Sequence, residues 1–245
     1  MALNLDKCVC ITFHRTVSPI KFDYSLSGIT LSRVTTVKDL GVIITSTLNW
    51  DAHVRSACSQ AVCKLGLIHR ISQHFTDILS FKTLYCTLVR PHLEYCCVIW
   101  SPHQKYLIED LERIQRRFLR LVGLRLGYGY LEVSTREVAS LLQLPALETR
   151  RFYHDAIFLF RLVNSTVDCP ELLERICFRV PAGTRSQYLF ARSSVSSSYL
   201  ANSTMRRIQL HGNLLPNHMD FFASSFLTFK RNLQTFINLQ HTETS

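Results

Sequence analysis

The periodicity of apolar residues changes near Asn49, and this change divides the chain into a short strand-forming part and a long helix-forming part. Residues 8–13, 20–24, 29–34 and 41–45 are short runs rich in β-branched and aromatic side chains, separated by turn signals. After Asn49, apolar residues recur at every third or fourth position. The chain is therefore predicted to be an α+β protein, with short β-strands at the N-terminus followed by a mostly α-helical region.

Proline, glycine and serine divide the helical part into several predicted helices. The first is expected to be capped by Asn49 or Asp51 and to bury the residues at helical spacing, which are Val54, Cys58, Ala61, Leu65, Ile68 and Phe75. A second should run from Asp77 to about residue 88 and be perturbed at Pro91, because proline lacks a backbone donor. A loop is expected at Gly123, Gly127 and Gly129. Further helices are predicted at residues 104–122, 135–143, 146–163, 204–214 and 221–237, with an extended connection at residues 180–202.

The helix predicted at residues 104–122 has two different faces. The apolar side chains on one face are Leu107, Leu111, Ile114, Phe118 and Leu121. The arginines on the opposite face are Arg113, Arg116, Arg117 and Arg120. This pattern predicts an amphipathic helix that buries its apolar side and exposes these four arginines as a basic stripe.

The basic stripe has two interpretations. Arginine can bond two phosphate oxygens at once, so these side chains could follow a nucleic-acid backbone. Alternatively, the stripe is an ordinary solvated face, since charged runs usually are. Glu109 would then neutralise Arg113, four residues later. Glu112 would neutralise Arg116 in the same way, and the other two arginines of the stripe would stay unpaired. The residues alone favour neither interpretation.

The overall charge points to polyanionic partners. The formal net charge of +10 favours association with nucleic acid or with an acidic membrane surface. No apolar stretch reaches the roughly 20 residues of a transmembrane helix, and the first residues do not have the pattern of a signal peptide. The nine cysteines are expected to be reduced thiols, most of them small core residues. We therefore expect an intracellular protein, nuclear or cytoplasmic, with no membrane partner.

Residue patterns that carry catalysis are missing from the sequence. Two-metal nucleotidyl transfer needs clustered carboxylates, and the chain has no adjacent pair of aspartates. Its adjacent acidic pair, Glu109-Asp110, falls in the first turns of a predicted helix, where a structural role is expected. Cysteines with zinc-ligand spacing, glycine-rich phosphate loops and nucleophile elbows are not found, and the histidines are scattered. We therefore predict no catalytic residue, no metal site and no cofactor.

Several short segments form an ordered set of motifs. In chain order they are NLDKC (4–8), VKDLGV (37–42), LVRPHLEY (88–95), WSP (100–102), LERIQRRF (111–118), DCPELL (168–173), MDFF (219–222) and FK (229–230). In this order they resemble the C-terminal part of reverse transcriptases from Jockey- and CR1-like non-LTR retrotransposons, and the resemblance covers nearly the whole chain. The resemblance implies four regions. They are a palm edge at residues 1–48, a thumb-like helical region at 49–125, a helical tail at 126–180, and an extended connection with C-terminal helices at 181–245.

The resemblance also implies a function. In polymerases of this kind the thumb holds the template–primer duplex, and the last palm hairpin helps to seat the primer end. By position, Lys38 matches that hairpin and the basic stripe belongs to the region after it. Both are therefore candidate contacts for RNA or DNA, bound with low specificity. The aspartate-bearing hairpin, the fingers and the endonuclease lie upstream in such elements. We therefore expect a fragment of an RNA-directed DNA polymerase that is not an enzyme alone and whose partners include the missing upstream domains.

Other interpretations stay open on the sequence alone. The chain could be a helical protein-interaction module whose apolar faces dock proteins and whose basic charge maintains solubility. It could also be a host protein domesticated from a transposon. A hydrolase built from scattered histidine, cysteine and aspartate ranks last, because no set of nucleophile, base and orienting group is visible.

Overall fold

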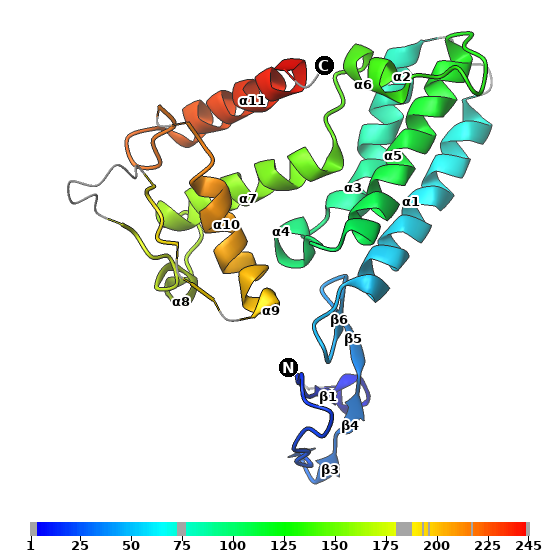
Figure 1. Ribbon diagram of the computed structural model, residues 1–245. Helices are drawn as coiled ribbons and strands as arrows, with labels where there is room; N and C mark the ends of the chain where they lie inside the picture. The colour runs from blue at the N-terminus through cyan, green and yellow to red at the C-terminus, as the bar shows by residue number, and fades with distance from the viewer. Residues whose placement is uncertain are drawn as a thin grey trace.

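Short strands followed by helices make up the protein, which belongs to the α+β class as the sequence predicted. The computed structural model describes residues 4–72, 77–179, 188–192, 194–195, 197–216 and 218–243. Figure 1 shows the strands as an N-terminal extension at one end of a helical body. None of the described helices is both long and apolar enough to cross a bilayer.

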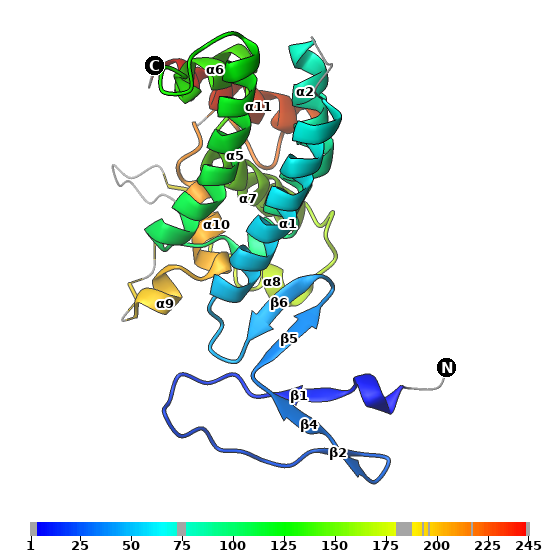
Figure 2. The same cartoon turned by 90° about the vertical axis from the view of Figure 1, so that its right-hand side faces the viewer.

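The N-terminal strands form separate two-stranded pairs. They are β1 (Val9–Ile11), β2 (Ser25–Leu26), β3 (Ile29–Thr30), β4 (Ser32–Val34), β5 (Thr36–Asp39) and β6 (Val42–Thr45). β1 pairs with β4 in parallel, whereas β2–β3 and β5–β6 are antiparallel hairpins (Figure 2). The strand predicted at residues 20–24 is wrong, because no strand of the described residues pairs with it along its length, and Ile20 is 93% exposed. Pairs this small bury little apolar surface and need support from the helices.

The β5–β6 hairpin docks on the helical body through its turn. Leu40 and Gly41 have φ angles of 44° and 89°, the left-handed geometry of a tight two-residue turn. Tyr95 donates a hydrogen bond from its hydroxyl to the Leu40 carbonyl at 2.8 Å. A Cβ atom on Gly41 would lie 3.2 Å from the Tyr95 ring, so glycine permits this close contact. Val42, which follows the turn, is buried in the helical core.

The helices lie close to their predicted positions. They are α1 (Asp51–Ile71), α2 (Ile78–Leu84), the π-helical segment η2 (Tyr85–Val89), α3 (Arg90–Glu94), α4 (Cys97–Trp100), α5 (Lys105–Arg125), α6 (Thr135–Leu141), α7 (Leu147–Val163), α8 (Pro170–Leu173), α9 (Ser198–Ala201), α10 (Thr204–Gly212) and α11 (Phe226–Glu243), and a 3-10 turn η1 (Leu5–Lys7) precedes β1. α11 begins later than the predicted residue 221, because Ser225 Oγ accepts the Thr228 amide at 3.2 Å and starts the helix there. Gly123 lies inside α5, not in the predicted loop.

Helix α1 buries most of the positions predicted from its periodicity. Those that are buried are Val54, Ala61, Leu65 and Ile68. Cys58 is half-buried, and Phe75 lies outside the described residues. Trp50 occupies the N-cap without a side-chain hydrogen bond, while Asn49 Oδ1 accepts the Asp51 amide at 3.3 Å. Asn49 therefore supports the first turn, in part as predicted.

The second helical stretch changes its hydrogen-bond register before Pro91. Asp77 caps α2 by accepting hydrogen bonds from the amides of Leu79 at 3.1 Å and Ser80 at 2.9 Å. The π-helical segment η2 follows, and α3 begins at Arg90. Because Pro91 has no amide to donate, the regular pattern cannot continue through it. The predicted perturbation at Pro91 is confirmed.

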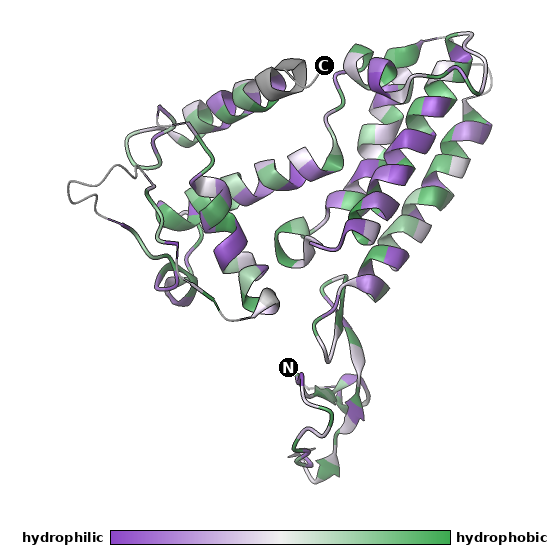
Figure 3. Ribbon diagram, viewed as in Figure 1, coloured by the Kyte–Doolittle hydropathy of each residue, from purple (hydrophilic) through white to green (hydrophobic). Residues whose placement is uncertain are grey.

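Two hydrophobic clusters form the core. The first lies among α1, η2, α3, α5 and α6, and the second among α7, α10 and α11. In the first, Tyr85 stacks on Phe118 and donates to Gln115 Oε1 at 2.9 Å. In the second, Ile176 and Phe190 are packed together with helix residues. The second cluster therefore spans the boundary that the sequence placed between residues 180 and 181. Figure 3 shows hydrophobic and hydrophilic residues alternating around the helices that enclose the clusters.

The cysteines are less buried than the sequence suggested. The structure records all nine as free thiols, of which Cys97 is buried. Burial raises the pKa of the Cys97 thiol to about 12. Cys63 and Cys177 are exposed and the other six are half-buried. The expectation that most are core residues is therefore wrong, because in α1 the Cys63 position falls on the outer face of the helix.

Candidate nucleic-acid interface

Helix α5 has the two faces that its sequence predicts. The apolar positions that are buried are Leu107, Leu111, Ile114 and Phe118. Leu121, also expected inside, is half-buried against the first core cluster. The exposed arginines of the basic stripe are Arg113, Arg117 and Arg120. Arg116 is half-buried and lies at the border of the basic face.

The ion pairs on α5 differ from those expected. Arg113 Nη1 lies 3.0 Å from Asp110 Oδ1, and Arg116 pairs with Glu109, about two turns away. The predicted pairs of Glu109 with Arg113 and of Glu112 with Arg116 are therefore wrong. Residues three, four and seven apart share a helix face, so several pairings compete. Because these pairs are solvent-exposed, they contribute little to stability.

The Glu112 carboxylate turns toward α7 instead of toward Arg116. Its Oε1 accepts a hydrogen bond from the Glu148 amide at 2.8 Å, where α7 starts without a side-chain cap of its own. Burial raises the pKa of Glu112, and hydrogen bonds from the α7 amides oppose this rise. Glu112 therefore satisfies the free amides at the start of α7. Spacing within one helix could not reveal this role, because the partner belongs to another helix.

Within the described residues, Arg117 and Arg120 are the unpaired members of the basic stripe. In the described part of the chain, neither forms an ion pair or a side-chain hydrogen bond. From Arg113 to the end of α5 at Arg125 the helix contains five arginines and no acidic residue. The expectation that these two arginines stay unpaired is confirmed, although the pairs that neutralise their neighbours are different ones.

Helix α1 runs parallel to α5 and places a further cation beside the start of α5 (Figure 2). Tyr106, near the start of α5, donates to Asp51 Oδ1 at the start of α1 at 2.6 Å. This hydrogen bond raises the pKa of Tyr106, and the nearby charge of Arg55 opposes the rise. Arg55 is exposed on α1. The position of Arg55 could not be predicted, because nothing in the sequence shows that these two helices are parallel neighbours.

Lys38 lies apart from the unpaired arginines. It is exposed on β5, in the hairpin that packs on the N-terminal end of α1. Burial lowers the pKa of His53 in α1, and the charge of Lys38 lowers it further, which places Lys38 near this end of the bundle. Tyr106 lies at the same end, and Arg117 follows it by eleven residues, about 16 Å of helix. The structure therefore does not bring Lys38 together with Arg117 and Arg120.

The exposed face of α5 offers electrostatic contacts to anions. Arg113 to Arg120 span about 10 Å of helix, and a duplex carries one phosphate charge per roughly 1.7 Å of its axis. Several phosphates would therefore fall within reach of the stripe. Among the described residues, no three histidine, cysteine or acidic side chains gather as metal ligands would. The adjacent acids Glu109 and Asp110 are engaged by arginines.

Comparisons with known proteins give one distant match. No protein-family model matches the chain, and no solved structure shows significant similarity to it. An uncharacterized protein of Caenorhabditis elegans is 30% identical over 86 residues, which cover 35% of this chain and 43% of that protein. The match therefore spans less than half of either chain and does not establish a family.

Proposed function

We propose that this protein binds nucleic acid through the exposed face of α5, with Arg117 and Arg120 as the principal phosphate contacts. The observation that carries the proposal is that both guanidinium groups are exposed and unpaired in the described part of the chain. An unpaired guanidinium group is charged and can donate two parallel hydrogen bonds to phosphate oxygens. The net charge of +10 adds attraction at longer range. Contacts of this kind bind RNA or DNA with little sequence preference.

The resemblance to retrotransposon reverse transcriptases supports the same proposal and suggests an origin. Two of the resembling segments contact each other, since Tyr95 in LVRPHLEY donates to the Leu40 carbonyl in VKDLGV. We propose that the chain is the thumb-like and tail part of such a polymerase, acting with domains supplied by the upstream part. On this proposal the chain alone adds no nucleotides, because the carboxylates that hold the two metal ions belong to the upstream part.

A helical protein-interaction module is the second candidate. The observation that favours it is the exposure of apolar side chains in the N-terminal region, where Val17 and Ile20 are 102% and 93% exposed and Phe22 is 66% exposed. Exposed apolar groups close in sequence are typical of docking surfaces. This candidate assigns no role to the unpaired arginines, so the same binding experiment separates the two.

The test compares two double variants of the whole chain that each remove two positive charges. The first is Arg117→Gln with Arg120→Gln. The control is Arg175→Gln with Arg231→Gln, whose side chains are exposed elsewhere. Binding to a fluorescent duplex and to a single strand is measured by anisotropy at fixed salt. We expect the α5 variant to lose at least about tenfold in affinity and the control to change little. Equal losses in the two variants would show that only net charge matters.

A further inference from the structure

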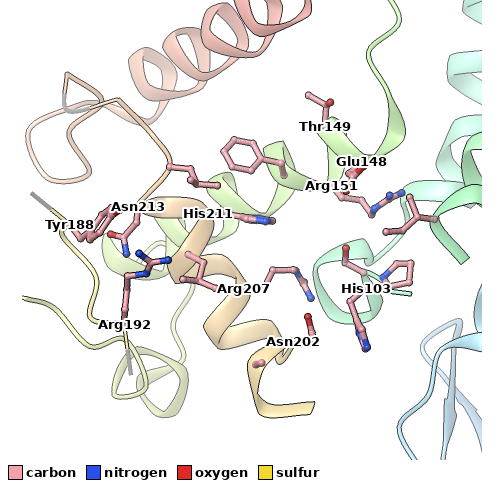
Figure 4. Close-up of a pocket in the computed structure, with 17 residues that line it drawn as sticks. His103, Glu148, Thr149, Arg151, Tyr188, Arg192, Asn202, Arg207, His211 and Asn213 are labelled. Carbon is pink, nitrogen blue, oxygen red and sulfur yellow. The ribbon is translucent and has the colours of Figure 1, made fainter. Parts of the chain in front are cut away.

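A cavity of about 700 Å³ lies between the segment after α4, helix α7 and helix α10. Figure 4 shows its polar side chains around the opening, with Arg151 coming from α7, Arg207 and His211 from α10, and His103 from the segment after α4. Tyr188 and Arg192 close another side. The volume falls within the roughly 300–1,000 Å³ that is usual for small-molecule sites.

Arg151 is buried in the wall of this cavity. Arg151 is only 3% exposed, and neither Nη1 nor Nη2 has a hydrogen-bond partner among the described residues. The neighbouring Arg150, in contrast, donates to Glu94 at 2.8 Å. Buried arginines in proteins are almost always paired, because an unpaired charge and unmet donors are costly away from water. The unmet donors of Arg151 therefore point to a ligand.

The acids around Arg151 do not supply the missing acceptors. Burial lowers the pKa of the Arg151 guanidinium, and the charges of Glu112 and Glu148 oppose this change. Within the described part of the chain, however, neither carboxylate lies at ion-pair distance from Arg151. Glu112 is occupied by the backbone amide of Glu148. The guanidinium therefore has distant charge compensation but no hydrogen-bond acceptor for its Nη groups among the described residues.

The other basic side chains of the wall are already oriented. Arg207 donates from Nε to Asp155 Oδ2 at 2.8 Å and from Nη2 to the Val98 carbonyl. His211 Nδ1 lies 3.0 Å from the same Asp155 oxygen, outside hydrogen-bond geometry. Arg192 lies with its guanidinium carbon 5.0 Å from the centre of the Tyr188 ring. The cavity wall therefore carries several oriented arginines, and among the described arginines that line it Arg151 is the one whose unpaired Nη groups are buried.

We propose that this cavity binds the phosphate group of a small phosphorylated molecule, with Arg151 as a bidentate donor to two phosphate oxygens. Phosphate fits because it has several acceptor oxygens and up to two charges, and because guanidinium groups bind it through paired N–H donors. Thr149 and Asn202 on the wall add neutral polar groups, and Phe152 and Tyr188 offer aromatic surface to the rest of the ligand. This site lies on α7 and α10 and is independent of the proposed contacts on α5.

The test uses calorimetric titration of the whole chain with inorganic phosphate and with phenyl phosphate, at constant ionic strength, and phenol as the probe without a phosphate. The variants are Arg151→Met, which keeps an unbranched apolar stem and removes the guanidinium group, and Arg192→Gln at the exposed rim. Arg231→Gln, exposed on α11, is the control. We expect both phosphates to bind, phenyl phosphate more tightly, and phenol not to bind. Arg151→Met should lose at least tenfold in affinity, Arg192→Gln severalfold, and the control nothing.

Melting curves in phosphate-free buffer test whether Arg151 has a structural role instead of a ligand-binding one. A buried guanidinium without acceptors costs stability when the site is empty, so Arg151→Met should melt at the parent's temperature or above it. A large fall in that temperature would overturn the proposal, since it would mean that the charge of Arg151 holds the fold together. Absence of binding in the parent, or equal binding by the parent and both cavity variants, would overturn it as well.

Discussion

Glu94 joins the two parts of the helical body through a network of basic side chains. It accepts hydrogen bonds from Arg150 Nη2 at 2.8 Å, lies 3.4 Å from His154 Nε2, and lies 3.7 Å from Arg90 Nε. Burial alone would raise the pKa of Glu94. The hydrogen bonds from His154 and Arg150 and the charges of Arg150 and Arg90 outweigh burial and lower the pKa to about 2.

The first prediction concerns the pH dependence of this network. A carboxyl whose pKa falls from 4.5 to about 2 on folding stabilises the protein above pH 4.5, and this contribution is lost as the pH falls toward 2. The shift corresponds to about 3 kcal/mol at neutral pH. Glu94→Gln should therefore lower the free energy of unfolding by about that amount at pH 7, with a smaller deficit at pH 3. Urea unfolding at several pH values measures both.

The control for this prediction is Glu109→Gln, because the Glu109 side chain is 53% exposed and its ion pair with Arg116 is screened by solvent. Its unfolding free energy should stay within about 0.5 kcal/mol of the parent value. A constant difference between Glu94→Gln and the parent from pH 7 to pH 3 would contradict the account of Glu94.

Individual residues also show how far the sequence could lead. Periodicity within α5 was sufficient to predict that Arg117 and Arg120 are exposed, because exposure depends on the helix alone. It failed for Glu112, whose partner is the Glu148 amide of another helix. It also missed Arg151, since α7 looks like an ordinary apolar helix until burial of that one position is known.

At the scale of single helices, Gly123 provides the second prediction. It lies inside α5, where a Cβ atom would approach Val133 Cγ1 to 2.4 Å. Gly123→Ala should therefore lower the free energy of unfolding by about 1–3 kcal/mol through overpacking, despite alanine's better helix propensity. The matched control is Gly66→Ala in α1, where nothing lies within 4 Å. It should stabilise by up to about 1 kcal/mol.

Thermal or urea unfolding of both variants measures this difference in sign. The double variant Gly123→Ala with Val133→Ala removes the clashing methyl groups and should recover part of the loss. Stabilisation by Gly123→Ala to the same extent as by Gly66→Ala would show that residue 133 does not pack against α5.

The helices were easier to predict than the strands for a physical reason. A helix satisfies its backbone hydrogen bonds locally, so the sequence could predict one helical stretch from Asp77 to about residue 88 with a perturbation at Pro91, which the structure divides into α2 and η2. A strand needs a partner, and the partner of β1 is β4, more than twenty residues later. The residues at 20–24 have strand-forming side chains but no strand beside them along their length, so the prediction there was wrong.

For the molecule as a whole, the proposed origin leads to a third prediction. The purified chain should extend no primer on an RNA or DNA template with magnesium or manganese, because no nearby carboxylates replace those of the upstream part. Incorporation of labelled nucleotides is measured beside a mock purification and an active reverse transcriptase. Primer extension above the mock level that co-purifies with the chain would contradict the proposal that the upstream part carries the catalytic carboxylates.

The arrangement of the whole molecule was the least predictable from sequence. Helices α1 and α5 are parallel neighbours, which brings Arg55 near Tyr106 at the start of α5. The second core cluster joins residues from both sides of residue 180, including Ile176 and Phe190. Both features depend on contacts between segments far apart in the chain, and periodicity contains no information about such contacts.

The fourth prediction tests the central proposal, that Arg117 and Arg120 contact phosphates, through its salt dependence. Each phosphate contact contributes roughly 0.7 to 0.9 to the slope of log affinity against log salt. Reversal of both charges, Arg117→Glu with Arg120→Glu, should therefore reduce that slope by about 1.4 to 1.8 and weaken binding across sequences.

The measurement is a salt titration of binding to a short duplex and to a single strand, for the parent chain and for this double variant. Folding should be little affected, because exposed substitutions cost only about 0.5 kcal/mol, and melting curves of both proteins check this. The account predicts a shallower slope and lower affinity for the variant. Equal slopes and equal affinities for two folded proteins would contradict it, and would show that the arginine face of α5 is only solvated surface.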